Sequence, residues 1–148
     1  MASTTFSGPV TSTNGFIGAL TGNIAGTGTI THTPTAINAT ATATAAQVAT
    51  GYITSTSAAA VSITLPTGTL LGAALGATQG TVFDLYIDNT AGATAVTVLV
   101  ATNGIKSDAA ATTAASFGQS TVAFGATGIG RFTLMFSSAT AYVFTRTA

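Results

Sequence analysis

The sequence predicts an all-β fold, a small antiparallel β-sandwich or jelly-roll-like barrel with an extended N-terminal arm. Residue types that fit a pleated, half-buried surface, chiefly Thr, Val, Ile and Phe, are common, whereas Glu is absent and Lys occurs once. Several segments alternate in apolar character with a period of two, and short turn-like stretches separate them. The 148 residues suffice for one domain with one modest core.

Residues 1–46 are low in complexity and predict an arm outside the β domain. The segment is rich in Thr, Ala and Gly and contains no charged residue. Its large apolar residues are too sparse for strong helical or strand periodicity. We therefore expect the β domain to cover 47–148. The large apolar side chains of the arm include Phe6, Val10, Phe16, Ile17, Leu20 and Ile24.

Five segments of the β domain show clear strand periodicity, because their alternate residues are apolar and share one face. Weaker strand candidates cover 48–55 and 120–124. The clear strands are "VSITLP" (61–66), "TVFDLYID" (81–88), "AVTVLVA" (95–101), "RFTLMFS" (131–137) and "AYVFTR" (141–146).

The inward faces of these strands predict one shared core. In the strand at 81–88, Asp84, Tyr86 and Asp88 fall on the face opposite to the apolar residues. The residues expected to line the core are Phe83, Leu85, Ile87, Val96, Val98, Phe132, Leu134 and Phe136.

The connecting segments carry turn signals. "DNTAG" (88–92) joins two predicted strands, and "SSAT" (137–140) predicts a hairpin between the last two. "TLLGAALGATQG" (69–80) breaks the strand pattern. Its Leu71 and Leu75 lie four residues apart, as on one face of a helix, so we expect one or two helical turns there.

The low charge content restricts the partners of the chain. Only six residues are charged and they cancel to zero, so we expect the protein to associate with other protein chains. Three scattered cations cannot neutralise a run of phosphates, which argues against nucleic-acid binding. No stretch reaches about 18 apolar residues, so no membrane span is expected. The absence of Cys excludes disulfides and thiolate zinc sites.

No catalytic, metal or cofactor site is expected. His32 is the only histidine, and no nucleophile-elbow motif accompanies it. Asp84 and Asp88 share a strand face, but four residues of extended chain separate them by roughly 13 Å, too far to share a ligand. A calcium site built from Asp88, Asn89 and carbonyl groups is a conceivable alternative, although EF-hand spacing is missing.

The stretch 62–106, followed by 128–146, resembles a domain found in capsid decoration and head-fibre proteins of tailed bacteriophages. The opening "FSGPVTSTNGF" (6–16) is similar to the start of many small phage structural proteins. The pattern consists of a Leu-Pro strand end, Gly-x-x-Phe-Asp before Ile-x-Asn-Thr, and an Asn-Gly turn. It is carried here by Leu65, Pro66, Gly80, Phe83, Asp84, Ile87, Asn89, Thr90, Asn103 and Gly104.

The resemblance implies a non-enzymatic virion protein on the outer capsid surface. It implies a homotrimer that contacts the major capsid protein, with other head or fibre proteins as further partners. The arm would then anchor the protein, because burial of its apolar side chains on the capsid offsets the entropy of ordering it. The expected capsid-contact residues are Phe6, Val10, Phe16, Ile17, Leu20 and Ile24.

Two other functions remain open on the sequence. A tail or fibre component that binds host glycan is the main alternative, and aromatic residues clustered on one loop face would favour it. The tyrosines available, Tyr52, Tyr86 and Tyr142, each lie on a predicted strand. A hydrolase is the third, supported only by His32.

Overall fold

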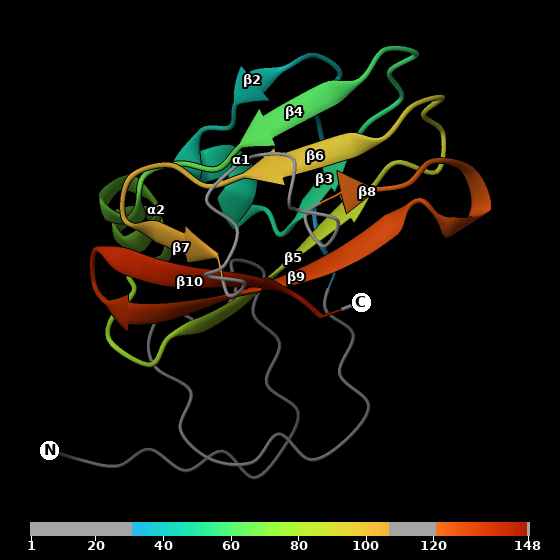
Figure 1. Cartoon of the computed structure of the whole chain (residues 1–148). Helices are drawn as coiled ribbons and strands as arrows, with labels where there is room; N and C mark the ends of the chain where they lie inside the picture. The colour runs from blue at the N-terminus through green and yellow to red at the C-terminus, as the bar shows by residue number, and fades with distance from the viewer. Residues whose placement is uncertain (1–30, 107–120, 148) are drawn as a thin grey trace, which may run out of the picture. The chain divides into compact units, whose positions relative to one another are not determined.

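A computed structural model describes residues 31–106 and 121–147, which form two β-sheets and two α-helices (Figure 1). The chain is mostly strand in this part, so the predicted β class is confirmed. The six-stranded sheet contains, in spatial order, β1 (Thr35–Ala36), β3 (Tyr52–Thr54), β5 (Val82–Asp88), β9 (Ile129–Ser138), β10 (Ala141–Arg146) and β7 (Gly104–Lys106). The four-stranded sheet contains β2 (Ala41–Thr42), β4 (Val61–Thr64), β6 (Val96–Leu99) and β8 (Thr121–Val122).

The predicted antiparallel arrangement is wrong, because the sheets are mixed and neither closes into a barrel. From β1 to β9, each successive strand belongs to the other sheet. Up to β6, strands two apart in sequence are neighbours and run parallel, as β3 does with β5 and β4 with β6, whereas β6 and β8 pair antiparallel. The segment 88–92 accordingly begins a crossing between sheets, whereas 137–140 makes the predicted hairpin between β9 and β10.

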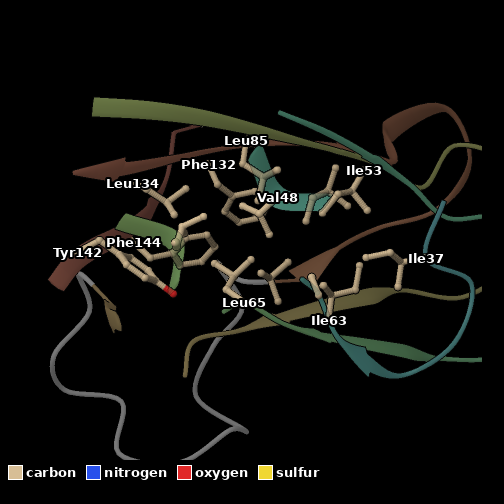
Figure 2. Close-up of a cluster of buried hydrophobic side chains, with 14 of the residues drawn as sticks. Ile37, Val48, Ile53, Ile63, Leu65, Leu85, Phe132, Leu134, Tyr142 and Phe144 are labelled. Carbon is tan, nitrogen blue, oxygen red and sulfur yellow. The ribbon is translucent and has the colours of Figure 1, made fainter. Parts of the chain in front are cut away.

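The two sheets bury their inward faces in one apolar cluster. Figure 2 shows Ile63 and Leu65 directed toward Leu85 and Phe132 of the other sheet. Every residue predicted to line the core is buried except Phe83, which is partly buried and packs at the edge of the cluster. Full burial of such a side chain contributes about 1.5–3 kcal/mol, so this cluster is the main source of stability.

Helix α2 (Gly68–Leu75) confirms the helical turns expected within 69–80. The Thr67 side chain accepts a hydrogen bond from the Leu70 amide at its start. Gly76, with φ of 58°, ends the helix in the left-handed conformation that favours glycine. Leu71 is fully buried. Gly72 packs so closely on the carbonyl of Ala139 that a Cβ would collide with it.

The weaker strand candidates are only partly correct. Residues 48–49 belong to α1 (Ala45–Ala49), in which Thr44 and Gln47 form a capping box, and β3 starts only at Tyr52. In the candidate at 120–124, the described strand is β8, Thr121–Val122, and a short 3₁₀ turn, η3 (Gly125–Thr127), follows it.

The predicted arm boundary at residue 46 needs correction. Strands β1 and β2 lie within 31–46 and pair with β3 and β4. Ile37 and Ala43 are buried in the shared core. Two-residue strands are too short to show an alternating pattern, which is why the sequence did not reveal them. Residues 1–30 lie outside the described residues, so for them the arm stays a prediction.

Leu134→Ala is expected to lower the free energy of unfolding by about 2–5 kcal/mol, because Leu134 is fully buried between the sheets. Urea denaturation measures this change. Leu70→Ala is the matched control, because it makes the same substitution at a side chain that is 60% exposed. A loss below about 0.5 kcal/mol for Leu134→Ala would contradict its place in the core.

A chain that starts at Thr31 is expected to fold, whereas a chain that starts at Gln47 is expected to have a markedly lower urea midpoint. The shorter chain lacks β1 and β2 and the buried side chains of Ile37 and Ala43. Circular dichroism followed through denaturation compares the two. Equal midpoints would show that residues 31–46 add nothing to the fold.

Candidate functional site

The outward face of the six-stranded sheet carries an unusual concentration of polar and aromatic side chains. The chain has six charged residues and one histidine, and three of those charges and the histidine gather on this face. Two of the three tyrosines join them. We call this set the outer patch: His32, Tyr52, Asp84, Tyr86, Asp88 and Arg131.

Strand register assembles the outer patch. On β5, Leu85 and Ile87 enter the core, so the residues between them and beside them face outward. Tyr86 lies opposite Arg131 of β9 on one side and Tyr52 of β3 on the other. Residues far apart in sequence therefore stand side by side across three strands.

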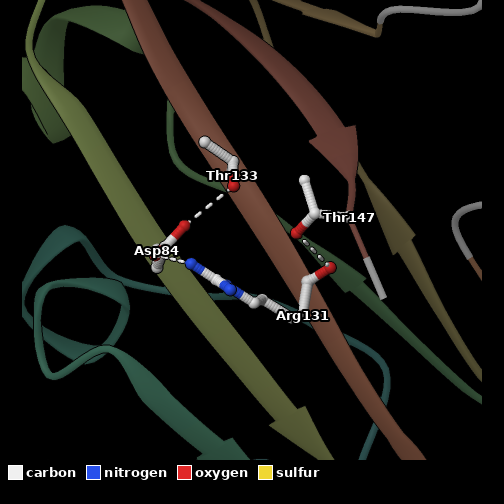
Figure 3. A network of polar contacts seen from close by, with 4 residues as sticks. All are labelled: Asp84, Arg131, Thr133 and Thr147. Atoms are coloured by element: carbon white, nitrogen blue, oxygen red, sulfur yellow. Dashed lines mark hydrogen bonds and ion pairs between the residues drawn. The ribbon is translucent and has the colours of Figure 1, made fainter.

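Asp84 and Arg131, both members of the outer patch, form an ion pair (Figure 3). Arg131 Nη2 donates to Asp84 Oδ2 at 2.6 Å, and the Thr133 hydroxyl donates to Asp84 Oδ1 at 2.8 Å. These two hydrogen bonds, with the Arg131 bond the larger cause, hold the pKa of Asp84 below its usual value. The carbonyl of Arg131 also accepts from the Thr147 amide at 2.9 Å, which ties the end of β10 to this site.

Asp88 is held by different partners. One carboxylate oxygen accepts from the amide and the hydroxyl of Thr90, at 2.9 and 2.6 Å, and the other accepts from the Tyr52 hydroxyl at 2.7 Å. The hydrogen bonds from Thr90 are the main reason that the pKa of Asp88 is lowered. The bond to Asp88 in turn raises the pKa of Tyr52, because it favours the neutral phenol.

Asn89, which the sequence offered as a ligand of a calcium site with Asp88, is instead hydrogen-bonded to backbone carbonyls. Its side chain is fully buried, and its amide nitrogen donates to the carbonyls of Thr94 and Ala123 at 2.8 and 2.9 Å. Asn89 therefore joins two connections between the sheets, whereas Asp88 faces outward. Within 31–106 and 121–147, no group of three or more His, Cys, Asp or Glu side chains is placed to hold a metal ion.

His32 is seated against the edge of the outer patch. Its Nδ1 lies 2.9 Å from the carbonyl of Thr50, which can only accept, so Nδ1 carries a proton and Nε2 is left as an acceptor in the neutral ring. The imidazole lies 5.8 Å from the Tyr86 ring. It covers Gly51, whose φ of +76° and close contact with the imidazole leave no room for a side chain. No carboxylate in the described ranges is hydrogen-bonded to His32, so a Ser-His-Asp arrangement is not assembled there.

A second feature of the same face is a set of exposed apolar side chains, which we call the apolar row. Val82 of β5 lies opposite Met135 of β9, and Met135 lies opposite Val143 of β10. Val82 and Met135 are 57% and 54% exposed. Large exposed apolar side chains on neighbouring strands are typical of surfaces that contact another protein.

A cavity of about 430 Å³ lies beside α2. Its walls contain no charged side chain, and the side-chain oxygens of Thr44 and Thr67 accept hydrogen bonds at the starts of α1 and α2. The cavity therefore has few polar groups that could bind a ligand. It is lined by Thr42, Ala43, Thr44, Ala45, Pro66, Thr67, Leu70 and Ala101.

Sequence reasoning placed part of the outer patch but not its assembly. Alternation put Asp84, Tyr86 and Asp88 on one face, as the structure has them. It gave no signal that Tyr52 and Arg131 would join them, because cross-strand register is not visible in a single strand. The residues predicted to contact a capsid, Phe6, Val10, Phe16, Ile17, Leu20 and Ile24, lie outside the described residues.

Comparisons of the chain with protein-family models, with curated proteins and with solved structures found no match. The helices of the described part are all too short or too polar to cross a membrane.

Arg131→Gln is expected to raise the pKa of Asp84 toward its usual value of about 3.9. Because the folded pKa is lowered, the stabilisation from Asp84 is present above that value and is lost as pH falls through the folded pKa. Carboxyl carbon NMR titration between pH 2 and 6 measures the shift, and Arg131→Lys, which keeps a cation, is the control. An unchanged Asp84 pKa in Arg131→Gln would contradict the ion pair.

Proposed function

We propose that the protein is a structural component of a tailed-bacteriophage virion that decorates or cements the outer capsid surface as a homotrimer. The observation that carries this proposal is the apolar row, which stands exposed on a chain with zero net charge. The resemblance of 62–106 and 128–146 to capsid decoration and head-fibre proteins is the reason for proposing a bacteriophage capsid as the particle. In this proposal the two sheets act as a compact β-sandwich that presents its faces to other protein subunits.

The apolar row supports association between copies. Val82, Met135 and the partly buried Val143 extend across three neighbouring strands, so one contact would cover the exposed area of all three. Burial stabilises such a contact by about 25 cal/mol per Å² of apolar surface. A chain with zero net charge also adds no overall repulsion between copies.

The N-terminal segment supports attachment to a different protein. Residues 1–30 carry no charge and contain the apolar side chains expected to contact the capsid. Ordering such a segment costs about 1–2 kcal/mol per residue, so burial of aromatic and branched side chains has to offset it. The major capsid protein, present in many identical copies, is the proposed surface, and other head or fibre proteins are further partners.

Removal of residues 1–30 is expected to abolish attachment to capsids that lack the protein, and Phe6→Ala with Phe16→Ala is expected to weaken it. The reason is the loss of apolar area that the proposal assigns to the contact. Co-sedimentation with undecorated capsids measures binding, and reconstruction of the decorated particles should show three copies at each site.

Phe124→Ala is the control for attachment, because its aromatic side chain is 52% exposed and belongs to neither the apolar row nor the N-terminal segment. Full-affinity attachment of a folded chain that starts at Thr31 would contradict the role of the N-terminal segment. Monomeric density on the particle would contradict the trimer.

A further inference from the structure

We propose that the outer patch is a binding site for a neutral glycan, with pyranose rings packed on Tyr52 and Tyr86 and hydroxyl groups bound by the charged side chains beside them. This inference uses other residues than the proposed capsid attachment, and it does not depend on that attachment.

The proposed platform consists of the two tyrosines. Tyr52 and Tyr86 are direct neighbours on β3 and β5, and adjacent strands lie about 4.8 Å apart. The face of an aromatic ring carries partial negative charge, which attracts the weakly positive C–H groups on one side of a pyranose ring. Both side chains are partly exposed, whereas Tyr142 is fully buried. Among the described residues, Tyr52 and Tyr86 are therefore the tyrosines that are exposed to solvent.

The polar groups around the platform suit sugar hydroxyls. Hydroxyls both donate and accept, so they bind best where carboxylate acceptors and guanidinium donors stand together. Asp84 uses one hydrogen bond on each oxygen, and Arg131 uses one of its five N–H groups on Asp84. His32 presents Nε2 as an acceptor next to Tyr86. The lone pairs and N–H groups that these side chains do not use among themselves are therefore concentrated in one small area of the surface.

The outer patch is also held in place before any ligand arrives. Asp84 is fixed by Arg131 and Thr133, and the Tyr52 ring is fixed by its bond to Asp88. The guanidinium of Arg131 lies over the Tyr86 ring, 5.9 Å from its centre, which limits the motion of both side chains. The part of the Tyr86 ring that stays exposed, together with Tyr52, is then the surface proposed for the sugar. Side chains that are already ordered lose less entropy on binding, which favours recognition of a weakly binding ligand such as a sugar.

Charge selects the class of glycan. Asp84 and Asp88 contribute two negative charges and Arg131 one positive charge, so these three side chains have a net charge of −1. Sialylated or sulfated glycans would be repelled, and neutral glycans would not. The apolar row lies at the other end of the face, because four residues of β5, roughly 13 Å, separate Val82 from Tyr86. Asp84 lies between the two, so a contact between copies at the apolar row would border Asp84 and leave Tyr86 beyond it.

The test uses the full chain on a printed panel of neutral gluco-, galacto- and manno-oligosaccharides, with sialylated and sulfated oligosaccharides beside them. The strongest neutral ligand is then titrated by isothermal titration calorimetry, which measures binding equally well in variants that lack a tyrosine. Tyr86→Ala and Tyr52→Ala are each expected to weaken binding by about tenfold or more, and Asp84→Asn by a similar factor. Phe124→Ala, an exposed aromatic outside the outer patch, is expected to leave binding unchanged.

Two results would overturn the proposal. One is binding to no panel member or to anionic glycans alone. The other is binding of a neutral glycan that survives the substitutions at Tyr52, Tyr86 and Asp84. Circular dichroism checks that each variant is folded, and if Tyr86→Ala is not, Tyr52→Ala and Asp84→Asn decide. Loss of capsid attachment and loss of glycan binding are read in separate assays, so either proposal can fail alone.

Discussion

The packing of two sheets on one apolar cluster is the constraint on which the rest of the molecule depends. Each sheet offers one face of branched and aromatic side chains, and the four-stranded sheet, with strands of two to four residues, is too small to bury its own face. Stability therefore requires both sheets at once. The chain meets this requirement by placing successive strands in alternate sheets, from β1 to β9.

That path explains features that otherwise look unrelated. Most of the parallel pairs arise along it, and so do the crossings between sheets, whose backbone groups need partners away from the ladders. The buried side chain of Asn89 provides some of these partners. In addition, the backbone N–H of Asn89 donates to the carbonyl of Gly128 at 2.6 Å. At the opposite face of the six-stranded sheet, the same register brings Tyr52, Tyr86 and Arg131 into one row.

Local periodicity predicted which face of each long strand is buried, but not which strands are neighbours. Phe132, Leu134 and Phe136 are inward because alternate residues share a face, and this is fixed within the strand. Strand direction and register depend on residues elsewhere in the chain. Ile37 and Ala43 were missed because each directly follows a strand of two residues, which is too short to carry a pattern. The sequence showed the members of the outer patch only as separate residues. Their assembly into one candidate site depends on the register between strands, which the sequence does not show.

The pairing of β5 with β9 has a consequence for folding kinetics. Val82 pairs with Met135 and Asp88 with Ile129, so the ladder closes across the whole of β6, β7 and β8. Topologies dominated by such distant pairings fold slowly, because the entropy of closing long loops is lost before the contacts form. During synthesis, β5 emerges long before β9 and has only β3 as a partner. The last strands to be made therefore complete the centre of the larger sheet rather than its rim.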